Sequence, residues 1–597
     1  MLSFADHFRR PGRTALFGTP QGYDGAVLAQ IARAVSMPVV FIAGDEMRLG
    51  PVHDALAFFD PALEVLSFPA WDCIPYDRVS PRADIVGRRL ETLLHLQDAE
   101  TGNRPAVVLT SAAAVIQRLP PRGALAAAVL SLKEGSRFDP AALAGHLSRH
   151  GYARAETVAE RGDFAVRGGI IDLFPPGTSE PLRLDFFGDE IEAIRLFDPA
   201  TQRTTGRCPS CTIKPVCEVF LDDASIARFR SAYRALFGAV TSDDLLYAAV
   251  SEGRHHAGME HWLPLFHGTL DTLFDYLGRA VIVLDDQVDA VLEGRLDLIA
   301  EHYATRKSLE GGRFADVAET YRPVPPERMY LDAASWAANL GRYPVAALSP
   351  FAAADDGADA GGRPGLDFAV SRSHPDINIF NAVLEQVGEQ QAAGRRVLIA
   401  AMSRGSRDRL FSVLKEHGLT GATIVETWTE AAALPSASVA FAVLPLDQGF
   451  LTHDLCVIAE PDILGERMVR RGGRRRPENF LKEASALSTG DLIVHIDHGI
   501  GRYEGLETIS VDAAPHDCLR IIYAGGDKLY LPVENIDLIT RYGGESEDVT
   551  LDKLGGAGWQ ARKARLKARI QAIAHELIAV AAARAVREAP MLTPPDG

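Results

Sequence analysis

Lysine, cysteine and long apolar runs are scarce in this chain of 597 residues. Only nine of its 62 basic residues are lysine, and none precedes Lys133. Six cysteines are too few for a disulfide framework at this length, which favours a reducing, intracellular location. Apolar stretches such as Val439–Leu446 are far shorter than the ~20 residues of a membrane-spanning helix. Met1–Phe17 has no apolar core of a secretory signal. We therefore expect a cytoplasmic protein that has no membrane partner.

Charge and length set further limits on the class of protein. The net charge is −17, which disfavours binding of the whole chain to DNA or to an anionic membrane. The hydrophobic fraction of 47% and charged fraction of 24% are typical of folded globular domains. A chain this long exceeds what one hydrophobic core serves, so we expect several domains.

The pattern of apolar segments predicts a multidomain α/β protein. A strand over 14–17, a Gly-rich turn, a helix over 26–35 and an apolar strand over 38–43 form a βαβ unit, and similar alternation predicts a parallel sheet. Short strands from 163 to 197 predict an α+β insertion, and those from 491 to 540 a small β-barrel. The expected divisions are 1–125 and 213–350 for the two parts of the first α/β domain, 126–212 for its insertion, 351–376 for a flexible linker, 377–468 for a small α/β domain, 469–484 for an Arg-rich linker, 485–548 for the barrel and 549–597 for a long helix.

The Gly-rich turn lies where a phosphate-binding loop would lie, between a strand and a helix N-terminus. Its glycines are Gly18, Gly22 and Gly25. A functional loop of this class needs a Lys for the outer phosphates and a hydroxyl for magnesium, and the turn has neither. Asp24 would in addition repel a phosphate. We therefore predict a degenerate nucleotide loop and no ATP or magnesium cofactor in this chain.

Other candidate sites carry weaker signals. Asp285 and Asp286 follow an apolar strand as a magnesium-binding acid would, but an acid pair often only ends a strand. His495, Asp497 and His498 surround a turn without a nucleophile, so solvation of the turn is the simpler interpretation. We find no catalytic constellation, and the chain alone is not expected to be an enzyme.

The cysteine cluster and the arginine run are the remaining candidates. Cys208, Cys211 and Cys217 lack the fourth ligand of a structural zinc site, so no metal is expected and small apolar contacts are the preferred interpretation. The run from Arg470 to Arg476 contains five arginines in seven residues. A solvated linker and a phosphate-contacting segment are both compatible with it.

Several motifs together resemble one protein family. They include WDCIPYDRVSP at 71–81, GDFAVRGGIIDLFP at 162–175, RLDFFGDEI at 183–191, PDILGER at 461–467, HIDHGIGRYEG at 495–505, KLYLPV at 528–533 and LGGAGW at 554–559. These segments are similar, in the same order, to the N-terminal half of the bacterial transcription-repair coupling factors, the Mfd family. The resemblance implies a UvrB-like module with a degenerate nucleotide loop, a third α/β domain and an RNA-polymerase-interacting, CarD-like domain with an SH3/Tudor-like barrel.

The resemblance also implies function and partners. Family members act in transcription-coupled nucleotide excision repair: they recognise RNA polymerase stalled at DNA lesions and recruit UvrA. An ATP- and magnesium-dependent motor that translocates on double-stranded DNA follows the long helix in the family, and no motor motif precedes Gly597. A family C-terminal domain masks the UvrA-binding face, so this chain is expected to bind UvrA without ATP, DNA or polymerase.

Two sets of contact residues follow from the family's motifs. The UvrA-contacting positions fall on Arg167, Arg183 and Phe187; the alternative is that Arg183 only pairs with Asp185 or Glu180 at the surface. The contact with the RNA polymerase β subunit falls on Leu506 and Ile509. These two residues would face solvent if their strand is an edge of the barrel, and the alternative is that both are core residues.

Overall fold

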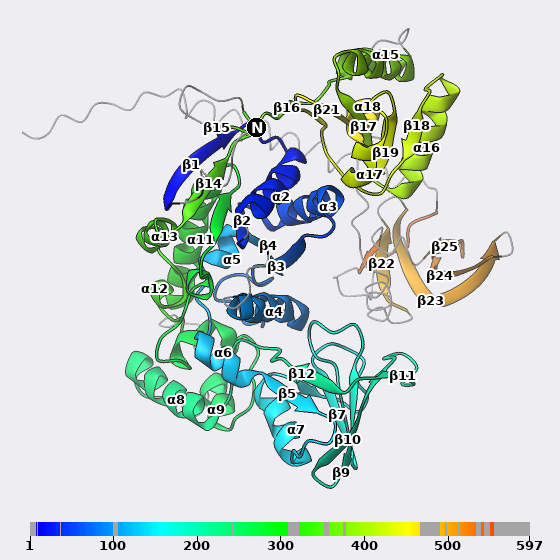
Figure 1. Ribbon diagram of the computed structural model, residues 1–597. Helices are drawn as coiled ribbons and strands as arrows, with labels where there is room; N and C mark the ends of the chain where they lie inside the picture. The colour runs from blue at the N-terminus through cyan, green and yellow to red at the C-terminus, as the bar shows by residue number, and fades with distance from the viewer. Residues whose placement is uncertain are drawn as a thin grey trace, which may run out of the picture. The chain divides into compact units, whose positions relative to one another are not determined.

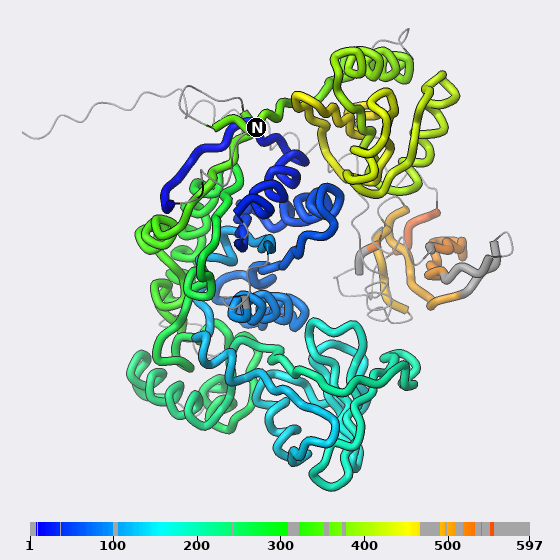
Figure 2. The backbone as a smooth tube through the Cα atoms, in the orientation of Figure 1, coloured from blue at the N-terminus to red at the C-terminus, as the bar shows by residue number. Residues whose placement is uncertain are grey.

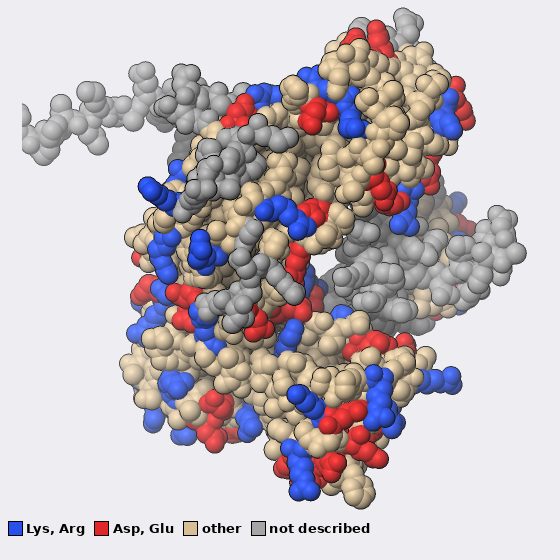
Figure 3. Space-filling view, viewed as in Figure 1, with Lys and Arg blue, Asp and Glu red and all other residues tan. Residues whose placement is uncertain are grey.

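The structure is a computed structural model that describes residues 8, 10–35, 37–99, 105–240, 244–308, 321–351, 358–373, 378–465, 490–495, 498–511, 514–532, 539–541 and 550–554. It divides into two compact units, Met1–Arg470 and Arg471–Gly597. Within the described residues, no helix is both long and apolar enough to cross a membrane. Figure 3 shows acidic and basic side chains interspersed over the visible described surface.

A seven-stranded parallel sheet forms the first α/β domain, as the sequence predicted (Figure 1). In spatial order its strands are β15 (Ala358–Asp359), β1 (Gly12–Phe17), β14 (Pro344–Leu348), β13 (Val281–Leu284), β2 (Val39–Ala43), β4 (Ala106–Ser111) and β3 (Glu64–Phe68). The early strand β1 lies between the late strands β15 and β14, and the late strand β13 pairs with the early strand β2, so early and late segments lie side by side, as the blue and green tube of Figure 2 shows. The inserted domain therefore interrupts the chain but not this sheet.

Alternating side chains of the sheet build a core on each face. On one face, Phe41 packs with α2 (Tyr23–Val35) and α3 (Leu49–Phe59). On the other face, Ile42 packs in a larger core with α4 (Ala83–Ala99) and the later helices. Those helices are α5 (Ala112–Val115), α6 (Arg122–Ala128), α8 (Asp223–Phe237), α9 (Leu245–Ser251), η2 (Met259–Leu265), α10 (Leu273–Tyr276), α11 (Val288–Ser308), α12 (Pro326–Met329) and α13 (Ala333–Leu340). A sheet covered on both faces explains the apolar strands of the sequence.

The inserted domain contains a six-stranded sheet with a helix on one face. Its spatial order is β11 (Thr204–Arg207), β10 (Glu190–Phe197), β9 (Leu182–Phe187), β8 (Ile170–Leu173), β7 (Asp163–Arg167) and β6 (Ala153–Arg154). Helix α7 (Pro140–Arg149) packs its Leu143 and Leu147 against buried strand residues such as Leu184. Strands β5 (Leu130–Lys133) and β12 (Ser210–Ile213) pair with each other where the insertion begins and ends. On the opposite face, Ala165 and Phe197 form a small second core with Val158 and Phe174, and the strand ends beyond this core carry exposed side chains such as Phe187.

The predicted flexible linker contains regular structure where it is described. Its β15 pairs with Leu16 and Phe17 of the first sheet, and β16 (Arg363–Pro364) pairs with Phe450 and Leu451 of the second. Helix α14 (Ala369–Ser373) follows. The prediction of a flexible segment was wrong for these residues because backbone hydrogen bonds to a sheet edge do not require apolar side chains.

The second α/β domain packs directly on the first. Its sheet runs in the order β16, β20 (Phe450–Leu451), β21 (Leu455–Ala459), β17 (Arg396–Ala401), β19 (Val439–Val443) and β18 (Ala422–Ile424). The helices are α15 (Ile379–Ala392), α16 (Arg404–Glu416), α17 (Trp428–Ala433) and α18 (Glu460–Leu464). One face of this sheet shares a core with Ala55 and Phe58 of α3. Tyr23 lies 5.3 Å from Phe450, between ring centroids.

The second unit is a five-stranded antiparallel sheet. Its order is β25 (Lys528–Pro532), β24 (Ala514–Ile522), β23 (Gly499–Val511), β22 (Leu492–His495) and β26 (Ile539–Arg541). Buried residues such as Ile493, Tyr503 and Leu519 form its core. The expected helix over 559–588 and the run Arg470–Arg476 lie outside the described residues.

The motif at 71–81 forms a tightly anchored loop. Tyr76 is buried and adopts a φ of 62°, a left-handed conformation that is uncommon for a residue with a side chain. Arg306 of α11 donates a hydrogen bond to the Tyr76 carbonyl at 2.9 Å. Ser80 donates one to the buried Glu260 at 2.7 Å, and burial raises the pKa of Glu260 to about 7. These contacts hold the loop against the helices of the first domain.

Candidate functional site

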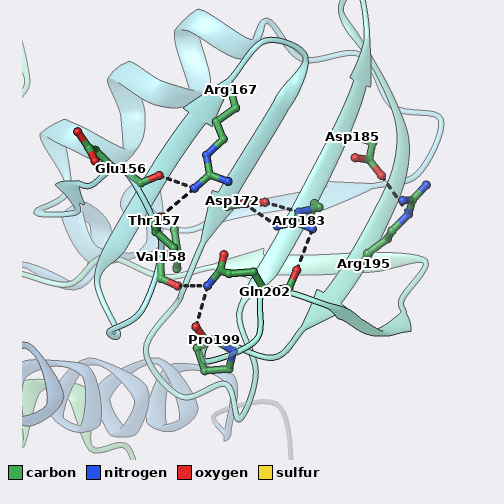
Figure 4. A network of polar contacts seen from close by, with 10 residues as sticks. All are labelled: Glu156, Thr157, Val158, Arg167, Asp172, Arg183, Asp185, Arg195, Pro199 and Gln202. Atoms are coloured by element: carbon green, nitrogen blue, oxygen red, sulfur yellow. Dashed lines mark hydrogen bonds and ion pairs between the residues drawn. The ribbon is translucent and has the colours of Figure 1, made fainter. Parts of the chain in front are cut away.

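The exposed face of the inserted sheet carries all three residues predicted to contact UvrA. Along β9, Leu182 and Leu184 point into the core with α7, so strand alternation places Arg183, Asp185 and Phe187 on the opposite face. Arg167 ends β7 on the same sheet. Figure 4 shows the polar side chains of this face from close by. We call this surface the outer face.

Arg183 is held by a buried partner. Its Nε and one terminal nitrogen donate to the two carboxylate oxygens of Asp172 at 2.7 and 2.9 Å (Figure 4). Its guanidinium carbon lies 4.6 Å from the centre of the Phe197 ring. The hydrogen bond to Asp172 raises the pKa of Arg183. Only 17% of the Arg183 side chain is exposed. The alternative that Arg183 pairs with Asp185 or Glu180 was wrong, because Asp172 is directly opposite it in the strand register.

Arg167 is exposed and bound at one end only. One terminal nitrogen donates to the carbonyl of Glu156 and to the Thr157 hydroxyl, the latter at 3.2 Å. Both acceptors belong to the segment before β7, at the border of the outer face. This leaves the other terminal nitrogen of Arg167 available to a partner.

Phe187 is the most exposed large apolar side chain of the described residues, at 80%. It is the last residue of β9, and Gly188 begins the two-residue turn to Glu190 with a φ of 65°. Because the turn allows the hairpin to close tightly, the ring projects at the end of the sheet. Exposed aromatic and arginine side chains on one surface are the composition of a protein-binding hot spot.

Sequence reasoning missed the residues that support this face. Asp172, Gln202 and Arg195 were not singled out, although all three lie in or next to predicted strands. Gln202 adopts a left-handed φ of 60°, and its side-chain amide donates to the backbone carbonyls of Val158 and Pro199. Its backbone carbonyl accepts a hydrogen bond from a terminal nitrogen of Arg183 at 3.4 Å. Pairing the predicted strands 182–187 and 190–197 as a hairpin would have placed Arg195 beside Arg183.

The Gly-rich loop of the first domain is filled by the side chain of Asp24. Its Oδ1 accepts hydrogen bonds from the backbone N–H groups of Gly22 and Gly25 at 3.0 and 2.7 Å. Asp24 is 1% exposed, and burial raises its pKa. A phosphate at this loop would meet the carboxylate of Asp24, which already accepts hydrogen bonds from N–H groups of the loop.

Arg48 joins this loop to the end of β13. It contacts the other carboxylate oxygen of Asp24, and its Nε donates to Asp285 at 3.0 Å. Asp285 is one of the two acids predicted at the strand end. The three side chains form an ion-pair cluster that satisfies charges which would otherwise be buried alone. We call Asp24, Arg48 and Asp285 the loop cluster.

Close packing leaves little room at the glycines of this loop. A Cβ on Gly25 would lie 2.4 Å from the Cβ of Ala55 in α3. A Cβ on Gly22 would lie 2.6 Å from Leu446, which belongs to the second α/β domain. At Gly18, a Cβ would lie 2.6 Å from the Asp359 carboxylate. These glycines serve close contacts within the protein.

In the second unit, Leu506 is 52% exposed. The residues of β23 from Leu506 to Val511 pair with β24, whereas β22 pairs only with Gly499–Arg502. Leu506 thus lies on a two-stranded hairpin that extends past β22. Its exposure is incompatible with a core position. Ile509 pairs with His516 in this hairpin, and its side chain lies outside the described residues.

The minor candidates have ordinary surroundings. Cys217 is buried and donates to the Val219 carbonyl at 2.8 Å, and burial raises the pKa of Cys211 to about 12. His495 is buried on β22, with its ring 4.6 Å from that of His498. The interpretation of His495 as a solvated turn residue was therefore wrong; Asp497 lies outside the described residues.

Comparison with known proteins identifies three modules. A UvrB interaction domain matches residues 130–218, a D3 domain of MFD matches 390–463 and a CarD-like/TRCF RID domain matches 487–543. The first match covers the sheet with the outer face, and the third covers the hairpin with Leu506. The chain is thus a multidomain protein that combines interaction modules with α/β domains.

Relatives with the same name match nearly the whole chain. The transcription-repair-coupling factor of Myxococcus xanthus is 32% identical over 99% of this chain and 50% of its own length. Those of Escherichia coli and Rickettsia bellii are 31% and 32% identical over 97% and 91% of this chain, and 50% and 47% of their own length. The chain belongs to the transcription-repair-coupling factor family, Mfd. It spans about half the length of the curated relatives it matches.

Proposed function

We propose that this chain acts in transcription-coupled nucleotide excision repair, where it links RNA polymerase stalled at DNA lesions to the recruitment of UvrA. The observation that carries the proposal is the presence of a UvrB interaction domain and a CarD-like/TRCF RID domain on one chain of this family. The proposed location is the cytoplasm. In this role the chain supplies binding surfaces and performs no chemistry itself.

UvrA is the proposed partner of the outer face. Phe187 supplies exposed apolar surface, and Arg167 and Arg183 supply hydrogen-bond donors on the same sheet. Aromatic and arginine side chains carry much of the binding free energy in protein interfaces. Because Arg183 is fixed by Asp172, little side-chain entropy is lost when the complex forms.

The β subunit of RNA polymerase is the proposed partner of the second unit. Among the described residues, the part of β23 beyond Arg502 pairs with β24 alone, which offers a strand edge together with the exposed Leu506. An exposed edge favours addition of a partner strand. We further propose that the unit closes into an SH3/Tudor-like barrel and that a long helix over 559–588 follows it.

Replacing Leu506 by Arg tests this surface. We expect capture of RNA polymerase to fall at least about tenfold, because a charge replaces an apolar contact. The thermal unfolding midpoint should not change, because the side chain is exposed. Val370→Arg is the matched control, since Val370 is exposed in the other unit.

Ile509→Arg is the companion variant. If Ile509→Arg abolishes polymerase capture and the fold stays intact, Ile509 contacts the polymerase. If the variant unfolds the second unit, Ile509 is a core residue. Full capture by the Leu506 variant would show that the hairpin is not the polymerase-binding surface.

The chain is also proposed to be part of an ATP-dependent translocase on double-stranded DNA, with its motor and the magnesium-ATP site outside these 597 residues. The relatives are about twice as long as the part that this chain matches, which leaves room for the motor that the resemblance to the Mfd family implies. The chain's own α/β domains are proposed to bind no nucleotide. The loop cluster supports this view because Asp24 occupies the N–H groups that would hold a phosphate.

We therefore expect no stoichiometric binding of magnesium-ATP at micromolar concentration. Equilibrium dialysis of the chain measures this directly, with a known ATP-binding protein dialysed in parallel as the positive control. One bound ATP per chain would contradict the proposal, and binding that vanishes in Gly22→Leu would locate it in the loop.

A further inference from the structure

Arg195 lies in a row of three arginines across the outer face. In the strand register it is directly opposite Arg183 of β9 on one side and Arg207 of β11 on the other. Directly opposed residues of antiparallel strands have neighbouring side chains on one face, and like charges there are destabilising. The repulsion within this row must therefore be offset by neighbouring acids, or the row is kept because it binds a partner.

Each arginine has its own acid, but the three pairs differ. Arg183 makes two hydrogen bonds to Asp172, and Arg207 makes two to Glu134 at 2.7 and 3.1 Å. Arg195 is bound to Asp185 only through Nε, at 3.1 Å, without the geometry of a hydrogen bond (Figure 4). In the described part of the chain, neither terminal nitrogen of Arg195 has a hydrogen-bond partner.

The exposed fractions separate Arg195 and Arg207 from Arg183. The Arg195 side chain is 47% exposed and that of Arg207 64%, against 17% for Arg183, so Arg195 differs from Arg207 by its free terminal nitrogens and not by exposure. The edge of the Arg195 guanidinium that is formed by its two terminal nitrogens can bind a carboxylate through two parallel hydrogen bonds, and this edge is open to a partner. The acids Asp189 and Glu190 lie at the other end of the face, beside Phe187, about 13 Å from Arg183 along β9.

We propose that Arg195 is a further partner-contacting residue of the outer face and that it binds a carboxylate group on the partner. Asp185 positions the guanidinium of Arg195 through its contact with Nε. Arg183, which Asp172 holds in place, is chiefly a fixed part of the surface. The partner that fits has an apolar pocket for Phe187 and an acidic side chain about 13 Å from that pocket, opposite Arg195. This inference rests on the proposed UvrA-binding function.

Charge reversal at Arg195 tests the inference, measured by calorimetric titration of UvrA into the full chain. We expect Arg195→Glu to weaken binding at least about tenfold, because a charge-assisted pair is replaced by repulsion. Arg195→Lys should lose less, since it keeps the charge without the two-pronged geometry. Arg207→Glu is the matched control, and we expect less than a twofold change because Glu134 already binds that guanidinium.

The outcomes separate this inference from the function on which it rests. Equal weakening by Arg195→Glu and Arg207→Glu would overturn it, because a general charge effect would then suffice. Unchanged binding of Arg195→Glu, with loss of binding in Phe187→Ala, would overturn it and leave the outer face as the UvrA site. Unchanged binding in both variants would reject the face itself. If Arg195→Glu lowers the unfolding midpoint, Arg195→Gln replaces it, with weaker binding still required.

Discussion

Replacing Phe187 by Ala should reduce UvrA binding about 30- to 1000-fold and leave the stability of the chain unchanged. The ring is 80% exposed in the free protein, so it gains burial only when a partner covers it. Truncating an aromatic hot spot costs about 2 to 4 kcal/mol of binding free energy. The measurement is calorimetric titration of UvrA into the variant and into the unaltered chain, with thermal unfolding of each of these two chains.

Phe351 supplies the matched control for this prediction. It is 69% exposed and lies in the first α/β domain, away from the inserted sheet. Phe351→Ala removes the same atoms from an exposed position and should bind UvrA as the unaltered chain does. Equal dissociation constants for both variants and the unaltered chain would show that UvrA does not use the outer face.

Replacing Arg48 by Met should lower the free energy of unfolding by about 3 to 5 kcal/mol. The substitution leaves the buried Asp24 without its cation, and breaking a buried pair from one side carries a cost of this size. Arg33→Met is the control, because its pair with Asp60 is half-exposed and contributes about 0 to 1 kcal/mol. Urea unfolding of both variants gives the comparison.

The loss in the Arg48 variant should depend on pH. Burial raises the pKa of Asp24, and Arg48 opposes that shift. Without Arg48 the folded-state pKa lies further above the unfolded value. The destabilisation is therefore largest above the folded-state pKa of Asp24 in the variant, shrinks as the pH falls through that pKa, and vanishes below the ordinary Asp pKa of about 4, where the carboxyl is neutral in both states. A pH-independent loss, or no recovery in Arg48→Met with Asp24→Asn, would show that the ion pair is not its cause.

Local patterns predicted the elements of the fold well. The alternation of apolar strands and amphipathic helices predicted the parallel sheet, because a strand buried on both faces must be apolar along its whole length. The short strands predicted between 163 and 197 include β9 and β10. The pairing of β15 and β16 with two different sheets was missed, because it depends on backbone groups that every residue carries.

The candidate site was predictable only in part. Phe187 and Leu506 were predicted from the family's motifs, and the structure shows both side chains exposed. The buried partner of Arg183 depends on strand register, and the loop cluster brings Arg48 and Asp285 to Asp24 from distant parts of the chain. Such contacts are set by tertiary packing, which no local pattern encodes.

The most direct test of the account is whether the chain bridges its two proposed partners. RNA polymerase is immobilised, and retention of UvrA is measured with and without the chain, in the absence of ATP and DNA. We expect retention only when the chain is present, loss of UvrA alone with Phe187→Ala, and loss of both chain and UvrA with Leu506→Arg. Retention of UvrA without the chain, or displacement of the chain from polymerase by UvrA, would contradict the proposed link.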